Sequence, residues 1–213
     1  VGAKAYHYGE EAVVLAAAHR IGRPLRWTAS RAESVLTDAH GRDQVTKIEL
    51  ACEKEGTFIA FRTETMANVG AYLSNFSTAT PTFLHGTLMA GNYAVPNVYV
   101  NVKAVFTNTV PVDAYRGAGR PEATYSIERV IDMTARELGM DPLDIRRKNF
   151  AKPDQFPFTS AAGLEYDTGN YDALVDKLEE MIDRKGFEAR RKESEKNGKL
   201  RGLGINSYIE ACG

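Results

Sequence analysis

Residues 43–70 read "DQVTKIELACEKEGTFIAFRTETMANVG", and this stretch decides the class of fold. Ile48, Leu50 and Cys52 share one face, with Lys47, Glu49 and Glu53 opposite or at the end, which is the period of two expected of a strand with one buried face. "KEG" at residues 54–56 supplies a turn, and residues 57–72 return as the partner strand. The pattern predicts a β-hairpin.

Further elements are predicted on both sides of this hairpin. Residues 97–108 alternate valines on one side and predict a third strand. Residues 10–21 are rich in alanine and predict a helix laid against the sheet, ended by Gly22 and Pro24. Residues 24–30, "PLRWTAS", predict a short strand with Trp27 in the core. Residues 74–92 lack clean periodicity and predict an irregular excursion with room for one short helix.

The second half of the chain is predicted to be mainly helical. Apolar residues recur at helical spacing between Pro121, which suits a first helical turn, and Gly139, which suits the C′ position. Asp141 and Pro142 then fit the N-cap and first position of another helix.

The remaining residues complete the predicted fold. A connector is expected at residues 150–170, a charged helical pair at 171–199 and a final strand at 200–213. Hairpin strands with helices between them favour an α+β fold, in which helices pack on an antiparallel or mixed sheet. No strand is followed by GxGxxG, so a Rossmann-type dinucleotide site is not supported.

Composition excludes several classes of function. The 213 residues carry a net charge of −1, which argues against a general binder of nucleic acids or membrane surfaces. No apolar run approaches the roughly 20 residues that a membrane helix needs. Two cysteines, Cys52 and Cys212, are too few to hold an iron–sulfur cluster alone. They stand far apart in the sequence and in no metal-ligand spacing, and a reduced, cytoplasmic setting is the simplest expectation. Because the chain opens in mid-pattern without Met, we expect it to be a fragment of a longer protein.

The stretch "AYRGAGRPE", residues 114–122, concentrates glycine and positive charge directly before a predicted helix. Gly117 and Gly119 permit positive φ, and the helix N-terminus leaves free N–H groups pointing toward the loop. Arg116 and Arg120 add planar cationic donors. These features suit a phosphate or another oxyanion, although an ordinary exposed turn explains the residues equally well.

Longer segments resemble the molybdenum-cofactor-binding large subunits of the xanthine oxidase, aldehyde oxidase and carbon monoxide dehydrogenase family. They are "VDAYRGAGRPEATYSIERVIDMTARELGMDPLDIRRKNF" at 112–150, "GAKAYHYGEEAVVLAAAHRIGRPLRW" at 2–27, "GRDQVTKIEL" at 41–50 and "GLGINSYIEACG" at 202–213. The resemblance implies that residues 1–213 are a fragment of the first molybdenum-binding region of a larger, multidomain subunit. That family hydroxylates aldehydes or aromatic heterocycles with oxygen drawn from water.

The resemblance also implies roles for residues of the arginine–glycine loop. It assigns cofactor binding to Tyr115, Arg116, Gly117, Gly119 and Arg120, with the contact at Arg116 made largely through the backbone. The positions of Ala118, Tyr99 and Ala5 line the substrate pocket in the family, where xanthine-oxidising members carry phenylalanine, arginine and glutamate respectively. These three departures predict that the protein is not a xanthine oxidase. Carbon monoxide dehydrogenases carry a copper-binding cysteine at the position of Gly117, so oxidation of carbon monoxide is not expected.

The resemblance implies a molybdenum–pyranopterin cofactor and leaves open whether it carries a cytosine dinucleotide. No side chain of this chain is expected to ligate the metal directly, and [2Fe-2S] clusters and FAD are expected on partner chains or domains of an oligomeric enzyme. No catalytic residue is expected here, because the family's catalytic glutamate lies in a later "GxGE" motif that residues 1–213 lack. The isolated fragment is therefore expected to be inactive.

Two other functions remain open at this point. One is a non-catalytic assembly module whose glycine loop is only a turn. The other is a phosphate-ligand protein that uses the same helix N-terminus. His85, in an irregular segment, is expected to be an ordinary loop or core residue, with an approach to the cofactor pocket as the alternative.

Overall fold

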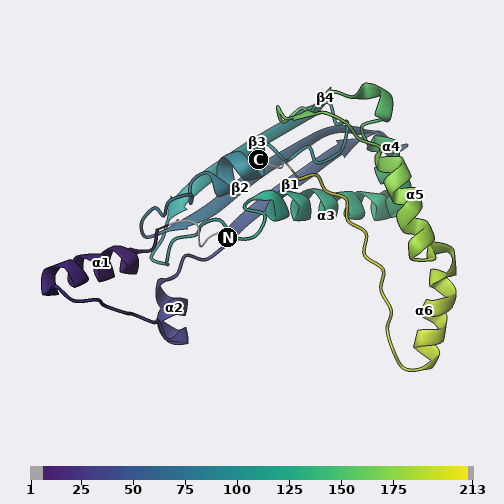
Figure 1. The fold of residues 1–213 in the computed structure, drawn as a ribbon. Helices are drawn as coiled ribbons and strands as arrows, with labels where there is room; N and C mark the ends of the chain where they lie inside the picture. The colour runs from purple at the N-terminus through teal and green to yellow at the C-terminus, as the bar shows by residue number, and fades with distance from the viewer. Residues whose placement is uncertain (1–6, 211–213) are drawn as a thin grey trace. The chain divides into compact units, whose positions relative to one another are not determined.

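The computed structural model describes residues 7–210, and the chain divides into two compact units. Unit 1 comprises Val1–Lys47, Thr63–Gly86 and Val100–Ala123, and unit 2 comprises Ile48–Arg62, Thr87–Tyr99 and Thr124–Gly213. Helices and two separate sheets are both present, so the α+β prediction is confirmed (Figure 1).

The larger sheet contains the predicted hairpin and the predicted third strand. Its strands are β1 (Gln44–Cys52), β2 (Phe58–Gly70) and β3 (Asn97–Phe106), in the order β1-β2-β3. The hairpin turn is closed by hydrogen bonds from the Glu53 amide to the Thr57 carbonyl (2.9 Å) and from the Gly56 amide to the Glu53 carbonyl (2.9 Å). Every second residue of β2 from position 61 to 69 is buried, which is the one-sided burial that the alternating sequence predicts.

Unit 1 contains helices α1 (Gly9–Ile21) and α2 (Arg31–Thr37) and the π-helix η2 (Thr80–Leu84). Helix α1 ends as predicted, with Gly22 in the left-handed conformation at φ 66°. The prediction that it packs on the sheet is wrong, because neither α1 nor α2 has a buried residue among those that the structure describes.

The predicted strand at residues 24–30 is also wrong, and Trp27 is 46% exposed rather than in the core. Helix α2 begins directly after these residues, at a capping box. The Glu33 amide donates to the Ser30 hydroxyl (3.3 Å), and the Ser30 amide donates to the Glu33 carboxylate (2.7 Å). This reciprocal pairing satisfies two amides at the helix start, so the local hydrogen bonds favour a helix.

Helix α3 (Arg120–Leu138) runs from unit 1 into unit 2 and follows the predicted bounds. Gly139 then takes φ 66°, and α4 (Pro142–Asn149) begins with the Asp141 carboxylate accepting the Leu143 amide at 2.7 Å. The predicted helical pair is present as α5 (Tyr171–Met181) and α6 (Phe187–Lys196), joined through the 3-10 helix η4 (Arg184–Gly186).

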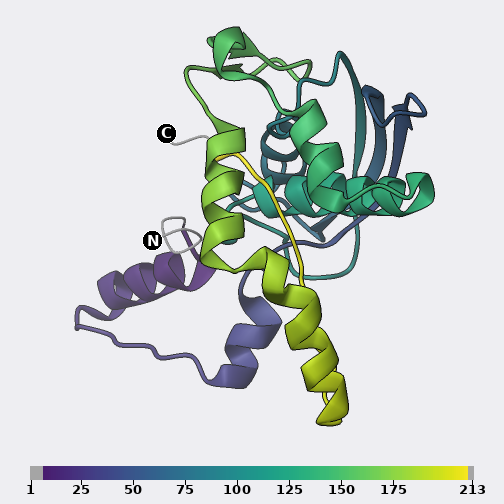
Figure 2. The same ribbon diagram turned by 90° about the vertical axis from the view of Figure 1, so that its right-hand side faces the viewer.

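Two parts of unit 2 differ from the sequence prediction. The expected connector holds η3 (Pro153–Gln155) and a small antiparallel sheet of β4 (Phe158–Thr159) and β5 (Glu165–Tyr166). Residues 200–210 form no strand but an extended segment that returns along α6 and α5 (Figure 2). Its Ser207 amide donates to a carboxylate oxygen of Glu128 (3.0 Å), so a side chain takes the place of a neighbouring strand.

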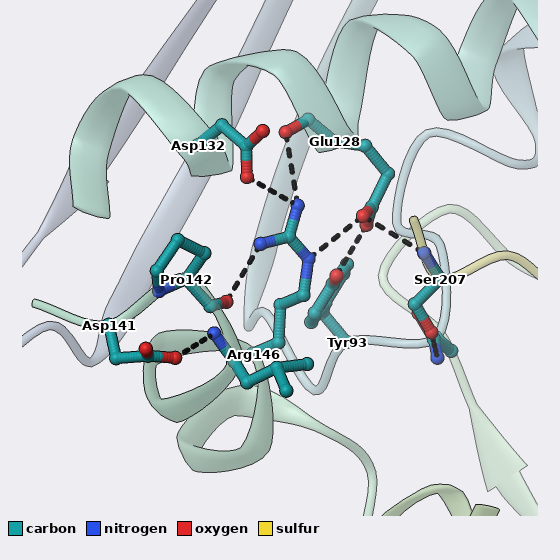
Figure 3. Close-up of polar contacts among 9 residues, drawn as sticks. Tyr93, Glu128, Asp132, Asp141, Pro142, Arg146 and Ser207 are labelled. Carbon is teal, nitrogen blue, oxygen red and sulfur yellow. Dashed lines mark hydrogen bonds and ion pairs between the residues drawn. The ribbon is translucent and has the colours of Figure 1, made fainter. Parts of the chain in front are cut away.

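A buried polar cluster lies in the core of unit 2 (Figure 3). Arg146 is fully buried and donates to the carboxylates of Glu128 (2.9 Å) and Asp132 (2.8 Å). Tyr93 and the Ser207 amide donate to the same Glu128 carboxylate. Burial raises the pKa of Glu128, and the charge of Arg146 opposes that rise. The cluster joins α3, α4 and the C-terminal segment through one charge-paired network.

Candidate functional site

The arginine–glycine loop of unit 1 has an unusual backbone. Gly117, Ala118 and Gly119 are consecutive and all have positive φ, at 92°, 40° and 89°. The Ala118 amide donates to the Tyr115 carbonyl (2.8 Å), and the Arg120 amide donates to the Gly117 carbonyl (3.1 Å). Left-handed residues are rare outside glycine, so Ala118 is held there by its surroundings. The chain turns sharply at this point and enters α3.

The same loop presents backbone donors next to a helix N-terminus. Within residues 7–210, the amides of Arg116, Gly117 and Gly119 donate to no other residue. The α3 N-terminus adds partial positive charge, and the exposed side chain of Arg116 adds a full one. This arrangement has the hydrogen-bond donors and the positive charge that suit an anionic group.

The space at Gly119 is closed by backbone atoms. A Cβ atom at this position would lie 2.4 Å from the Thr80 carbonyl oxygen and 2.8 Å from the backbone nitrogen of His85. Thr80 begins η2, and His85 follows its last residue. The loop therefore lies directly against the η2 backbone, which only glycine permits.

His85 is fully buried next to this contact. Burial lowers its pKa to about 4, and a hydrogen bond with the Gly119 backbone opposes the shift only in part. The Nε2 atom of His85 lies 3.5 Å from the Thr65 hydroxyl on β2. The imidazole is neutral at physiological pH and supports the loop from the core side. His85 was expected to be a loop or core residue, and its burial places it in the core, in contact with the loop backbone.

Asp113 fixes the residue at which the loop begins. Its carboxylate is buried and accepts hydrogen bonds from the Ala114 amide (2.6 Å), the Phe76 amide (3.4 Å) and the Ser74 hydroxyl. The Asp113 amide in turn donates to the His40 carbonyl at 2.7 Å. Both the side chain and the backbone at this position are therefore tied to other segments of unit 1.

A cavity of about 550 Å³ opens at the same anchor. Asp113, Tyr8, Tyr72 and Ser74 are among the residues that line it. Burial raises the pKa of the Tyr8 hydroxyl, and the nearby carboxylates of Asp38 and Asp113 add to the rise. The segments that line this cavity include part of the resemblance at residues 2–27 and residues just before the arginine–glycine loop.

Arg42 also contacts the loop. Its guanidinium donates to the Arg116 carbonyl and lies over the Tyr115 ring, 4.8 Å from the ring centroid. Its Nε atom is 3.8 Å from a carboxylate oxygen of Glu122 in the first turn of α3. The sequence prediction missed both Arg42 and Asp113, because each acts through a partner distant in the chain. The only signal was their position within segments 41–50 and 112–150.

The structure brings together six of the eight residues predicted for the site. Tyr115, Arg116, Gly117, Ala118, Gly119 and Arg120 form the loop, and Ala118 is half-buried. Tyr99 lies in β3 in unit 2 and is 53% exposed. Ala5 lies outside the described residues. Among residues 7–210, no three His, Cys, Asp or Glu side chains converge on a possible metal position, and no helix is long and apolar enough to span a bilayer.

The loop fits an anionic organic cofactor by its own geometry. Gly119 has no room for a side chain, and a Cβ at Gly117 would lie 2.7 Å from Pro121. The amides of Arg116, Gly117 and Gly119 have no acceptor within residues 7–210, and the arginines at 116 and 120 add positive charge beside them. Such donors suit phosphate, oxo or thiolate groups, which accept hydrogen bonds.

Comparison with known proteins shows the family of the chain. Residues 2–150 match the family model described as a molybdopterin cofactor-binding domain. The chain is 35% identical over 201 residues to the carbon monoxide dehydrogenase large chain of Hydrogenophaga pseudoflava, covering 91% of this chain and 25% of the relative. It is 32% identical over 222 residues to the nicotine 6-hydroxylase large subunit of Paenarthrobacter nicotinovorans, covering 100% of this chain and 26% of the relative.

Comparison with solved structures agrees with the sequence comparison. The crystal structure of quinoline 2-oxidoreductase from Pseudomonas putida 86 matches with a TM-score of 0.87 and 34% identity, over 92% of this chain and 25% of that one. The chain thus spans about a quarter of the length of the relatives that it matches. It belongs to the molybdopterin cofactor-binding domain family.

Proposed function

We propose that this chain forms one wall of the molybdenum–pyranopterin site in a hydroxylase that oxidises an aldehyde or an N-heterocycle with water as the oxygen source. The observation that carries the proposal is the loop at residues 115–120, whose unshared amides lie at the N-terminus of α3 beside the exposed Arg116. When bound, the cofactor supplies the two-electron oxidation chemistry.

In this proposal the residues of this chain bind the cofactor and orient it. Tyr115, Arg116, Gly117, Gly119 and Arg120 hold the cofactor, mainly through backbone N–H groups and positive charge. The neutral His85 behind Gly119 excludes water from the core side of the loop. The catalytic glutamate is supplied from outside residues 1–213, so this chain alone does not turn over substrate.

The substrate class is narrowed by side-chain size and chemistry. The loop contributes Ala118 to the substrate pocket in this proposal, one of the three positions, with Tyr99 and Ala5, that the family resemblance assigns to it. The methyl group of Ala118 cannot clamp a flat ring as a phenylalanine would, which disfavours purines. Gly117 offers no thiolate to hold copper, which disfavours carbon monoxide. The names of two relatives, a nicotine hydroxylase and a quinoline oxidoreductase, support an N-heterocycle.

Electrons leave through partners in this proposal. Iron–sulfur and flavin subunits or domains accept them, within an oligomeric, cytoplasmic enzyme. The names of relatives as large chains or subunits support an assembly of several chains.

The test is the metal content and activity of the full-length protein purified with its neighbouring subunits. We expect about one molybdenum per subunit, bound iron, and turnover of aldehydes or N-heterocycles in a substrate screen that includes xanthine and carbon monoxide as controls. Turnover of either control would overturn the substrate assignment. The absence of molybdenum from the purified complex would overturn the enzyme function.

One observation favours the alternative of an assembly module. Helices α1 and α2, both within the described part of the chain, bury none of their residues and expose Val13, Leu15 and Leu36, so apolar surface is available for other parts of a larger protein. An intact complex that lacks molybdenum, and that falls apart when these side chains are made polar, would support this alternative.

A further inference from the structure

Arg42 makes three contacts with two ends of the same loop. Its guanidinium donates to the Arg116 carbonyl, lies over the Tyr115 ring, and is 3.8 Å from the Glu122 carboxylate. Tyr115 and Arg116 precede the glycines, and Glu122 follows them in α3. One side chain therefore bridges the entry and the exit of the turn.

Backbone contacts around Arg42 hold this residue next to the loop. Arg42 has φ 61°, a conformation that non-glycine residues adopt rarely and keep only where the surroundings fix them. At Gly41, a Cβ atom would lie 2.5 Å from the Tyr115 Cβ, so the two segments are in close contact. At His40, the amide donates to the Pro111 carbonyl (2.9 Å) and the carbonyl accepts the Asp113 amide (2.7 Å).

The contact with the Arg116 carbonyl determines where the next amide points. In a trans peptide the C=O of one residue and the N–H of the next point in opposite directions. Because Arg42 holds the carbonyl of Arg116, the N–H of Gly117 is directed away from Arg42. Within residues 7–210 that N–H has no acceptor.

We propose that Arg42 is the positioning residue that orients the Gly117 amide as a hydrogen-bond donor to an anionic atom of the molybdenum cofactor. The inference rests on the proposed function. It adds a role for a residue outside the loop, one that acts through the Arg116–Gly117 peptide and touches neither metal nor substrate.

The experiment compares Arg42→Ala, Arg42→Lys and wild type in the full-length complex. Molybdenum per subunit is measured by mass spectrometry, the Mo(V) signal by electron paramagnetic resonance, and hydrogen exchange over residues 115–120. We expect Arg42→Ala to lose about tenfold or more in molybdenum retention after dialysis, the size of effect typical of residues that orient metal-site ligands. Arg42→Lys keeps one donor and falls between the two.

Added guanidinium ion gives a readout that a merely structural role would not move. At low-millimolar concentration it occupies the space left in Arg42→Ala, and we expect it to restore molybdenum retention and the wild-type Mo(V) signal. Arg191→Ala is the matched control, because within residues 7–210 the ion pairs of Arg191 are exposed ones, with Glu188 and Glu195 (3.7 Å each). We expect it to behave as wild type.

The outcomes separate this inference from the proposed function. If wild type and Arg42→Ala hold molybdenum equally with the same Mo(V) signal, the role of Arg42 is wrong and the proposed function stands. If wild type holds none, both fall. If Arg42→Ala does not fold, the soluble Arg42→Lys decides: a Mo(V) signal identical to that of wild type, with unchanged exchange at residues 115–120, overturns the inference.

Discussion

Replacing Gly119 with alanine tests whether the close contact between the loop and η2 shapes the proposed cofactor site. The new Cβ would lie 2.4 Å from the Thr80 carbonyl oxygen, whereas ordinary contact begins at 3.4 Å. The two backbones must therefore separate by about 1 Å, and such overpacking costs about 1–3 kcal/mol. A left-handed alanine adds about 1–2 kcal/mol, so we expect a local loss of roughly 2–5 kcal/mol.

Gly139→Ala is the matched control for this variant. Gly139 also has positive φ, 66°, but a Cβ added there would meet no atom within 4 Å, so only the conformational cost applies. Hydrogen exchange of the full-length subunit measures local opening at residues 79–86 and 116–123 for one variant, and around 139 for the other. An extra loss of about 2 kcal/mol makes opening roughly 30-fold more frequent.

We expect Gly119→Ala to lose molybdenum as well, while Gly139→Ala retains it. The contrast matters because both variants replace a left-handed glycine next to α3. Equal exchange and equal molybdenum content in the two variants would refute the argument that backbone contact with η2 holds the loop in its binding shape.

Two further predictions concern buried titratable side chains. Because the folded-state pKa of His85 is about 4 and the unfolded value is about 6.5, its stabilising effect is complete above about pH 6.5 and declines as the pH falls toward 4. The loss of stability amounts to about 3 kcal/mol. Hydrogen exchange at residues 80–86 should show this loss in wild type and not in His85→Gln. An equal pH dependence in the two proteins would contradict the prediction. Arg146→Met leaves the buried Glu128 without its cation and should cost about 3–5 kcal/mol in urea unfolding of the subunit. Arg147→Met, which breaks partly exposed ion pairs with Asp176 and Glu179, should cost only about 1 kcal/mol, so equal losses would argue against the buried cluster.

The sequence predicted those elements whose signals are local. The hairpin follows from alternation at residues 43–70, and α3 and α4 follow from helical periodicity bounded by Gly139 and Asp141. Helix α2 was missed although "SRAE" at residues 30–33 is a capping box, because its apolar residues are too few to show periodicity. The segment at 200–210 reads as a strand, but no strand pairs with it in the described structure and Glu128 receives its Ser207 amide instead.

In the candidate site, too, the residues with local signals were predicted and those that act over long sequence distances were not. Glycine, proline and arginine mark the loop in the sequence, because each acts on its own backbone or carries its own charge. Arg42 and Asp113 act across distances of 74 residues (to Arg116) and 39 residues (to Ser74), and no local pattern connects them. The contact between Gly119 and η2 was likewise not predicted, because the conformational freedom of a glycine does not indicate which segment packs against it.

These long-range contacts support the proposal of a binding loop over that of a simple turn. A turn that only starts a helix needs glycine and a proline, and it would leave its entry and exit free. This loop is held at Asp113 by a buried carboxylate, at Arg116 by Arg42, and at Gly119 by the η2 backbone. Two non-glycine residues, Arg42 and Ala118, keep left-handed conformations in the process. Such strain is retained where the surrounding structure over-determines a functional geometry, and what it fixes here is the direction of backbone N–H groups that the described chain leaves unshared.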